Sequence, residues 1–322
     1  MSIDLVLTTT EKKHQIPVVG DEITWELSRK NEPGKLTFKV VADSLLSMEE
    51  GNNVQLVVDK QNLFTGYVFT MKRDKNQIID ITCYDQLRYM KNKDLYVYTN
   101  KKANELLQMI TSDFGLHTGT IEDTGYIIPQ RREDNQTLFD IVQYALDETV
   151  RNTNQLFVLY DDFGNITLKN IANMKSKTLI DADTASDYDY SSSIDSTTYN
   201  YIKLVYESKK EGQRLTPFIA KDTKTQEKWG ILQYFGKVQT DIGGQERANE
   251  MLKLYNRVSR TLTVKNALGD YAVRAGSLVP ISLNLGDMKV ESYLVAEKVI
   301  HHIKHGIHTM DLKLSGGDGF VS

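Results

Sequence analysis

The chain has little of what marks secreted, membrane-spanning or redox-active proteins. A single cysteine stands among its 322 residues, so no disulfide can form within one chain. Cys83 alternates with Ile79 and Ile81, which predicts a buried small side chain and not a reactive thiol. No apolar run approaches the roughly 20 residues that cross a bilayer, and the start of the chain lacks the regions of a signal peptide. We therefore expect synthesis in a reducing compartment, no membrane insertion, and any release from the cell by a route such as lysis.

Common catalytic signatures are missing as well. The sequence has no nucleophile elbow, phosphate-binding loop, zinc-protease motif or dinucleotide-binding glycine pattern. Gly243 and Gly244 stand where a helix begins, and capping explains them better than anion binding. Neighbouring carboxylates that could hydrolyse sugars stay open as an alternative among 43 acidic residues, but nothing singles out a pair. We therefore assign no catalytic, cofactor-binding or metal-binding residue.

An excess of charge of either sign is also absent. Lys and Arg number 39, and Asp and Glu 43, so the net charge of -4 gives no general attraction to nucleic acid or anionic lipid. Arg131 and Arg132 are followed at once by Glu133 and Asp134, which predicts a solvated ionic surface. The acidic stretch 177–198 lacks the glycine and the terminal acid of a calcium loop, which favours a solvated linker. This balance favours proteins as partners.

Four histidines near the end of the chain form the most evident candidate for a metal site. His301, His302, His305 and His308 fall within eight residues, and imidazoles bind zinc, nickel and copper. In an extended strand His301 and His302 point to opposite faces, and His305 lies in a turn beside Gly306. Only a cross-strand pair such as His301 with His308 can share a face. We therefore predict a polar hairpin tip with one half-buried histidine, and no physiological metal.

What the sequence does have is apolar alternation with period two, the pattern of half-buried β-strands. It runs from Ile3 to about Asp85 and returns over 260–314, where a β-meander is predicted. Seventeen Tyr and only five Pro agree with strands, so the predicted fold class is mainly β (α+β). Turn-forming residues separate the first strands at 31–34, 50–53, 59–62 and 73–76.

Helical periodicity separates these two β-rich parts. Asn100 is placed to cap a helix that ends near Gly115. A second helix starts at about Thr137, with Asp140 in its first turn. A hairpin over 156–168 completes a small α/β module.

These patterns divide the chain into three parts. Residues 1–98 are predicted as a first β domain, 99–176 as a small α/β domain, and 177–322 as a linker and a second β domain. A helix near 244–257 leads into the last meander. The region 198–227 is left open, either as strands of the second domain or as a long excursion from it.

Segments from all three parts of the chain, taken in chain order, resemble the late control D or baseplate hub family of contractile phage tails. The likeness is greatest to the branch found in prophages and phage-tail-like bacteriocins (tailocins) of Gram-positive bacteria. The first segments resemble strands of the family's first barrel, the middle ones its α/β insert, and the last its second barrel. The segments are 23–25, 36–40, 63–68, 83–90, 136–142, 159–168, 229–235, 273–277 and 308–314.

The resemblance implies an architecture and an assembly. Each chain would hold two tail-tube-like β-barrel domains with a small α/β insert between them. Three chains would form a ring of six barrels, a pseudo-sixfold adaptor between the tail tube and a threefold central spike. Family relatives form the base of the valine-glycine repeat spike of type VI secretion. Because this chain stops soon after its second barrel, spike and lysozyme domains are expected in separate proteins.

The implied function is that of a structural, non-enzymatic hub in a virion or tail-like particle, assembled in the cytoplasm of the bacterial host. Its partners would be further copies of the chain in a homotrimer, the tail tube or tube-initiator protein, the central spike protein and other baseplate proteins. No recognition of nucleic-acid sequence is expected. The alternative is a cell-wall-directed hydrolase or glycan-binding module of the tail tip, which the 17 tyrosines and the histidine cluster motivate.

Overall fold

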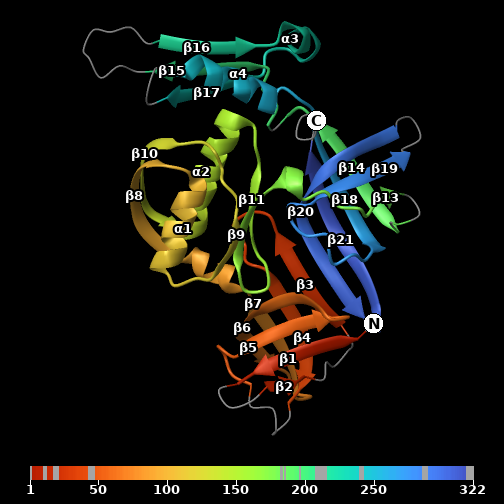
Figure 1. Cartoon of the computed structure of the whole chain (residues 1–322). Coiled ribbons are helices and arrows are strands. Elements are labelled where there is room, and N and C mark those ends of the chain that lie inside the picture. The colour runs from red at the N-terminus through yellow and green to blue at the C-terminus, as the bar shows by residue number, and fades with distance from the viewer. Residues whose placement is uncertain are drawn as a thin grey trace.

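The computed structural model is mainly β with a few helices, as the alternation in the sequence predicted. Two β units, a middle unit and a smaller outer α/β unit can be followed in Figure 1. No helix of the described residues is long and apolar enough to cross a membrane. The structure describes residues 2–9, 13–16, 22–42, 48–181, 184, 186–195, 197–206, 216–238, 243–284 and 289–316.

A single sheet of 13 strands runs through both β units. Strand β20 (Lys289–Lys304) joins them, because its first half pairs with β19 (Leu278–Asn284) and its second half with β3 (Glu22–Ser28). Strand β21 (Ile307–Gly316) pairs with β20 as well. The two predicted β domains are therefore edge-to-edge parts of one sheet (Figure 1).

The first β unit buries the alternating residues that predicted it. Ile23, Trp25 and Leu27 point inward from β3, and Leu36 faces them from the next strand. Asn31 adopts a left-handed backbone conformation in a predicted turn, a geometry that Asn tolerates well. Its other strands are β1 (Ile3–Thr8), β2 (Lys13–Gln15), β4 (Lys35–Val41), β5 (Asn53–Val58), β6 (Gln61–Arg73) and β7 (Ile78–Tyr84).

The second β unit is the predicted meander. Met310, Leu312 and Leu314 are buried on one face of β21, as their period of two predicted. They share a core with Leu262 and Val299 from the two strands that pair with β21. The other strands are β13 (Ile180–Asp181), β14 (Asp187–Ser193) and β18 (Ser259–Leu268).

An ion pair lies where β20 changes from one partner strand to the other. The register of β20 shifts between Ala296 and Lys298, and Glu297 lies at this irregularity. Arg29 donates from Nε and Nη2 to the two oxygens of Glu297, at 2.8 and 2.9 Å, and its backbone amide donates to the Glu297 carbonyl. Burial opposes the ionised form, but the Arg29 guanidinium and hydrogen bonds, including one from Ser315, hold the pKa of Glu297 below its ordinary value.

The middle unit packs two helices against short strands. The apolar stripes of both helices face one core, which also includes Ile166 and Leu168 from the predicted hairpin. Its elements are η1 (Gln86–Lys91), β8 (Lys93–Lys101), α1 (Ala103–Asp113), β9 (Thr118–Ile121), β10 (Ile128–Thr137), α2 (Leu138–Thr153), β11 (Phe157–Asp161), β12 (Ile166–Asn170) and η2 (Ile171–Asn173).

The helix starts in the middle unit follow the prediction in one case and differ in the other. Thr137 caps α2, since its Oγ1 accepts a hydrogen bond from the Asp140 amide at 3.1 Å. Helix α1 starts after Lys102, so the predicted cap at Asn100 was wrong. Asn100 still belongs to β8, whose pairing with β10 continues to Lys101, and the chain turns into a helix only after that pairing ends.

The observed pairing also bears on where the first β domain ends. Strand β8 pairs with β10 in a two-stranded sheet of the middle unit, so a boundary at residue 98 would cut through this strand. The last strand of the first β unit ends at Tyr84, and Asp85 then begins the short helix η1. We therefore propose to place the boundary near Asp85.

The outer α/β unit is a separate layer beside α2. Strands β15 (Tyr201–Tyr206), β16 (Thr216–Lys221) and β17 (Gln233–Val238) form their own sheet in the order β16-β15-β17. Helix α4 (Gly244–Tyr255) covers one face with Ala248 and Met251, and α3 (Thr223–Trp229) connects two of the strands. In Figure 1 this unit lies at the top, away from the first β unit.

This unit resolves the region that the sequence left open, and it corrects one expectation. Residues 201–206 and 216–221 form strands, but in an excursion outside the 13-stranded sheet. The segment 229–235, which resembles part of the second barrel, also lies in this excursion. The reason is that the apolar side chains of β15 find their cover in α4, and both elements lie in a segment inserted between β14 and β18 of the second β unit.

The ion pair between the β units gives a first testable expectation. Replacing Arg29, whose side chain is 10% exposed, with Leu leaves the Glu297 carboxylate without its main partner. We expect the free energy of unfolding to fall by about 2 kcal/mol. The control is Lys39→Leu, which removes the exposed Lys39–Asp80 pair and should cost less than about 1 kcal/mol. Equal effects of the two variants in urea unfolding would contradict this role of Arg29.

Candidate functional site

Three segments that are far apart in the sequence meet where the two β units contact the middle unit. Asp85 follows the last strand of the first β unit, Asp161 ends β11, and Arg274 lies in the loop between β18 and β19. Arg274 donates from Nη2 to the backbone carbonyl of Asp161 at 2.6 Å, and its guanidinium lies 4.1 Å from the ring centre of Tyr160. We call this meeting point the three-way junction.

Asp85 fixes the first β unit at the three-way junction. Its carboxylate accepts hydrogen bonds from the backbone amides of Gly34 at 2.9 Å and Leu87 at 3.0 Å. Its own amide donates to the Gly34 carbonyl. A side chain at Gly34 would collide with this carboxylate, so the turn before β4 requires glycine here.

Gln86 and Gly276 complete the three-way junction. The Gln86 amide donates to the carbonyls of Gly164 at 2.6 Å and His117 at 3.1 Å, and its oxygen accepts from the His117 amide. Gly276 has a φ of 95°, and a Cβ there would come within 2.7 Å of the methyl groups of Val158. The close contact of the second β unit with β11 therefore depends on this glycine.

The electrostatics of the three-way junction favour a structural role. Burial and the neighbouring Asp161 raise the pKa of Asp85 well above its ordinary range, against hydrogen bonds from two backbone amides. Burial likewise raises the pKa of Asp161. Asp85 and Asp161 are 3% and 7% exposed, so neither carboxylate is presented to a substrate. The three-way junction therefore holds the two β units and the middle unit together.

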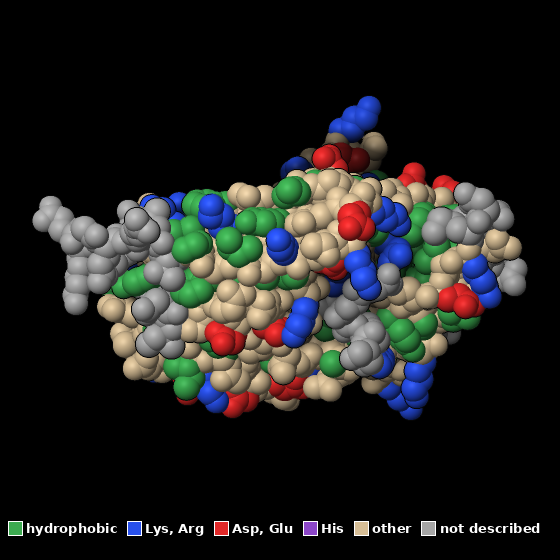
Figure 2. Space-filling view, turned by 90° about the horizontal axis from the view of Figure 1, so that it is seen from above, with side chains coloured by type: hydrophobic (Ala, Val, Ile, Leu, Met, Phe, Trp, Pro, Cys, Tyr) green, Lys and Arg blue, Asp and Glu red, His purple; other side chains and the backbone are tan. Residues whose placement is uncertain are grey.

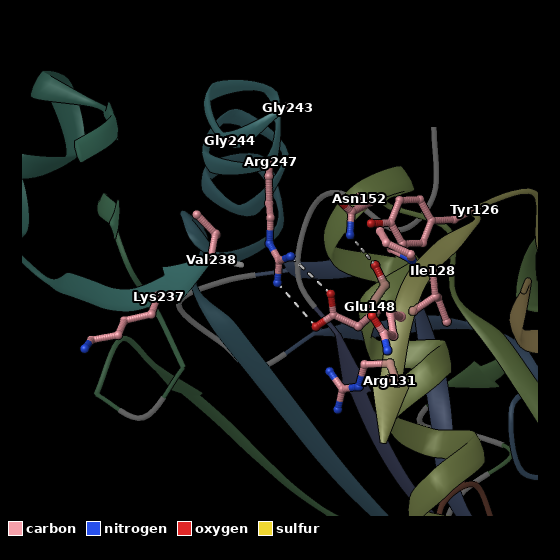
Figure 3. Close-up of a pocket in the computed structure, with 12 residues that line it drawn as sticks. Tyr126, Ile128, Arg131, Glu148, Asn152, Lys237, Val238, Gly243, Gly244 and Arg247 are labelled. Carbon is pink, nitrogen blue, oxygen red and sulfur yellow. Dashed lines mark hydrogen bonds and ion pairs between the residues drawn. The ribbon is translucent and has the colours of Figure 1, made fainter. Parts of the chain in front are cut away.

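A second contact joins the outer α/β unit to the middle unit, beside a pocket of about 280 Å³ (Figure 3). Glu148 of α2 pairs with Arg247 of α4, with Nη1 to Oε2 at 3.1 Å and Nη2 to Oε1 at 3.3 Å. Arg151 also donates to Glu148, at 2.9 Å. Gly243 and Gly244 line the pocket at the start of α4, where Gly243 is the cap with a φ of 71°.

Among the four histidines, His301 is buried, His302 and His308 are partly buried and His305 is exposed. His301 and His308 lie on one face, as their register predicted, with Nδ1 of the first 3.0 Å from Nε2 of the second. His302 is on the opposite face, near Asp311, and His305 is in the turn. The prediction of one half-buried histidine understated the burial, because His301 is fully buried and His308 is partly buried.

Aromatic rings enclose the histidine pair. Trp25 stacks on His301 with ring centres 4.9 Å apart, and Tyr271 stacks on His308 at 3.8 Å. Burial lowers the pKa of His301 to about 3 and that of His308 to about 4. Among the described residues, no three His, Cys, Asp or Glu side chains come together as a metal site. The aromatic partners come from other strands and loops, so spacing along the sequence could not reveal them.

The fold is that of phage tail proteins. The solved structure of a 43 kDa tail protein of prophage MuSo2 from Shewanella oneidensis matches 97% of this chain and 98% of its own, with a TM-score of 0.71 and 12% identity. The E. coli protein c3393 matches 96% of this chain and 76% of its own, with a TM-score of 0.55 and 9% identity.

The family follows from the sequence. Residues 23–315 match the YQBQ-like family, so the chain belongs to it. One relative is the phage-like element PBSX protein XkdQ of Bacillus subtilis, which is 28% identical over 92% of this chain and 92% of its own. The resemblance to phage tail proteins is thereby confirmed. Three segments that carried it, 83–90, 159–168 and 273–277, are those that meet at the three-way junction.

Arg274 offers a test of the three-way junction. Arg274→Lys keeps the charge but removes the planar group that stacks on Tyr160 and reaches the Asp161 carbonyl. We expect the free energy of unfolding to fall by about 1 to 2 kcal/mol. Arg132→Lys, at an exposed ion pair, is the matched control and should have almost no effect. If both variants unfold at the same urea concentration, Arg274 does not hold the junction.

The histidine pair predicts a pH dependence. Both pKa values lie below the unfolded value of about 6.5, so on acidification the unfolded chain takes up protons that the folded chain does not. Stability should fall as the pH drops from about 6.5 towards 4, by up to about 1.4 kcal/mol per pH unit for each histidine. A His301→Phe/His308→Phe variant should show a smaller slope in unfolding titrations. His305→Asn, in the turn, should keep the original slope, and an unchanged slope in the double variant would disprove the assignment.

Proposed function

We propose that the chain is a structural, non-enzymatic protein of a phage tail or phage-tail-like particle, and that it forms the baseplate hub. Three copies would place their six β units around the tail axis as a pseudo-sixfold ring between the tail tube and the central spike. The tube or tube-initiator protein, the spike protein and other baseplate proteins would be its partners. The chain would be located in the baseplate of the phage or tail-like particle.

The observation that carries this proposal is the pairing of β20 with β3. It joins two β units of one chain edge to edge in a fixed orientation. In a ring of six such units built from three chains, every second contact would be this one, and the remaining contacts would lie between chains. A chain with two joined units is therefore suited to adapt a sixfold tube to a threefold spike.

The ends of the sheet support an assembly of this kind. Among the described residues, the branched sheet has three end strands: β14 pairs only with β18, β2 only with β1, and β13 only with β19. An edge strand exposes backbone groups that can pair with a strand of another chain. We assign the contacts between chains to these edges, where Asp187 and Asp189 of β14 are exposed.

The names of the relatives support a place in a phage tail or a related particle. PBSX protein XkdQ belongs to a phage-like element. Protein c3393 is a component of the type VI secretion system and is structurally similar to the T4 bacteriophage tail proteins gp27 and gp5. The alternative of a hydrolase or glycan-binding module gains nothing from the histidines, because His301 and His308 contact each other and stacked aromatic rings.

The native mass of the purified chain tests the hub. We expect a species near three times 36.7 kDa in light scattering across a concentration series, and images of it with pseudo-sixfold symmetry. If the free chain is monomeric, the same measurement follows on the chain mixed with its tube and spike proteins. A chain that is missing from purified tails, or that stays a monomer within them, would refute the proposal.

A further inference from the structure

Among the residues that the structure describes, a helix covers only one face of the sheet of the outer α/β unit. Helix α4 packs on the side that carries Ile202, Leu204 and Ala220. The opposite face consists of the alternate residues of the same strands, and we call it the open face. Phe235 is 55% exposed on it and Ile219 is 39% exposed. Figure 2, which views this end of the molecule from above, shows hydrophobic and basic side chains exposed side by side.

The strand register arranges the open face in three rows. The middle row is Ile219, Lys203 and Phe235, in the order β16-β15-β17. Each of the two flanking rows has a lysine at one edge of the sheet, and the two edges are opposite. Lys221 of β16, Lys203 of β15 and Lys237 of β17 therefore lie on one diagonal line. The flanking rows are Lys221, Tyr201 and Gln233 on one side, and Pro217, Val205 and Lys237 on the other.

The diagonal divides the open face into two apolar parts. Tyr201 and Phe235 lie on one side of it, and Ile219 lies on the other beside Val205, which is only 5% exposed. Among the residues that the structure describes, Lys203 and Lys221 take part in no ion pair. The open face thus combines the positive charge of Lys203 and Lys221 with aromatic and aliphatic surface.

We propose that the open face binds an acidic amphipathic helix of another tail protein, an assignment of partner that rests on the proposed function. Carboxylates on one stripe of this helix would pair with Lys203 and Lys221, while apolar side chains beside the stripe would contact Phe235 and Ile219. The unit would then have a helix on each face of its sheet, which is a common layered arrangement.

The spacing of the charges agrees with a helix. Diagonal neighbours on adjacent strands lie about 7 to 8 Å apart, which is the relation of Lys203 to Lys221 and to Lys237. Carboxylates four residues apart on a helix have Cβ atoms about 6 Å apart, and flexible lysine side chains cover the difference. A helix that crosses the sheet along this diagonal can therefore meet Lys203 and Lys221.

The experiment uses the full chain and a fluorescent helical peptide of roughly 18 residues, long enough to cross three strands. The peptide carries Glu at every fourth position between leucines, and a second peptide carries Lys in place of Glu. Fluorescence anisotropy measures their affinity for the chain and for Lys203→Glu/Lys221→Glu. The control Lys224→Glu/Lys228→Glu makes the same charge change on α3 of the same unit, where both lysines are exposed.

We expect the charge-reversed open face to bind the Glu peptide at least roughly tenfold more weakly and to bind the Lys peptide better than the original chain does. The α3 control should bind as the original chain does. Equal affinity for both peptides, equal loss in both variants, or no binding of the Glu peptide would overturn the proposal. Binding of oligothymidine instead, weakened by Phe235→Ala, would overturn it in favour of single-stranded nucleic acid.

A second measurement places the open face in the assembled particle. Lys203→Cys should react with a maleimide in the free chain and be protected in purified tails, whereas Lys224→Cys should react in both. Cys83 is buried and does not contribute. If the chain is present in tails but Lys203→Cys reacts there as well, the open face is not covered and this inference fails alone. If the chain is missing from tails, the proposed function fails, and the peptide measurement decides the open face separately.

Discussion

The pairing of β20 with β3 is the constraint on which the rest of the structure depends. It brings a strand near the end of the chain against a strand near its start, and the Arg29–Glu297 pair that accompanies it spans 268 residues of sequence. Joining ends so far apart costs chain entropy, which the backbone ladder and the shared core must offset. Once β20 is paired on both sides, the two β units have one relative position. The other units can then attach to a defined frame.

The three-way junction attaches the middle unit to that frame. Arg274 from the second β unit and Asp85 at the end of the first lie against Asp161 of β11, and Gln86 at the start of η1 donates to Gly164 in the turn of the hairpin β11–β12. The contacts depend on buried polar groups and on glycines that permit a close approach, so they tolerate little change of geometry. A ring assembly needs units of constant orientation, and this junction supplies it within one chain.

The outer α/β unit is held differently, by α4 against α2 and by the Arg247–Glu148 pair. It lies outside the 13-stranded sheet, and within the described part of the chain a helix covers only one face of its own sheet. In the proposed assembly the β units would provide the surfaces of the ring, while this unit would provide a peripheral surface for one more partner. Its composition of lysines among aromatic and aliphatic residues favours an acidic, amphipathic partner over the chain's own units.

Local patterns in the sequence determined the strands, turns and helices, because periods of two and of 3.6 follow from backbone geometry alone. The alternation of β3 and β21, the cap at Thr137 and the shared face of His301 and His308 were all readable in this way. The start of α1 was not, since pairing with a distant strand carried β8 past Asn100. Likewise, only the tertiary structure decided that β20 serves both β units, that 229–235 lies in the outer α/β unit, and that Asp85, Asp161 and Arg274 meet. These features are contacts between segments that are not neighbours in the sequence, and the alternation of a strand fixes which face is buried but not which strand will be its neighbour.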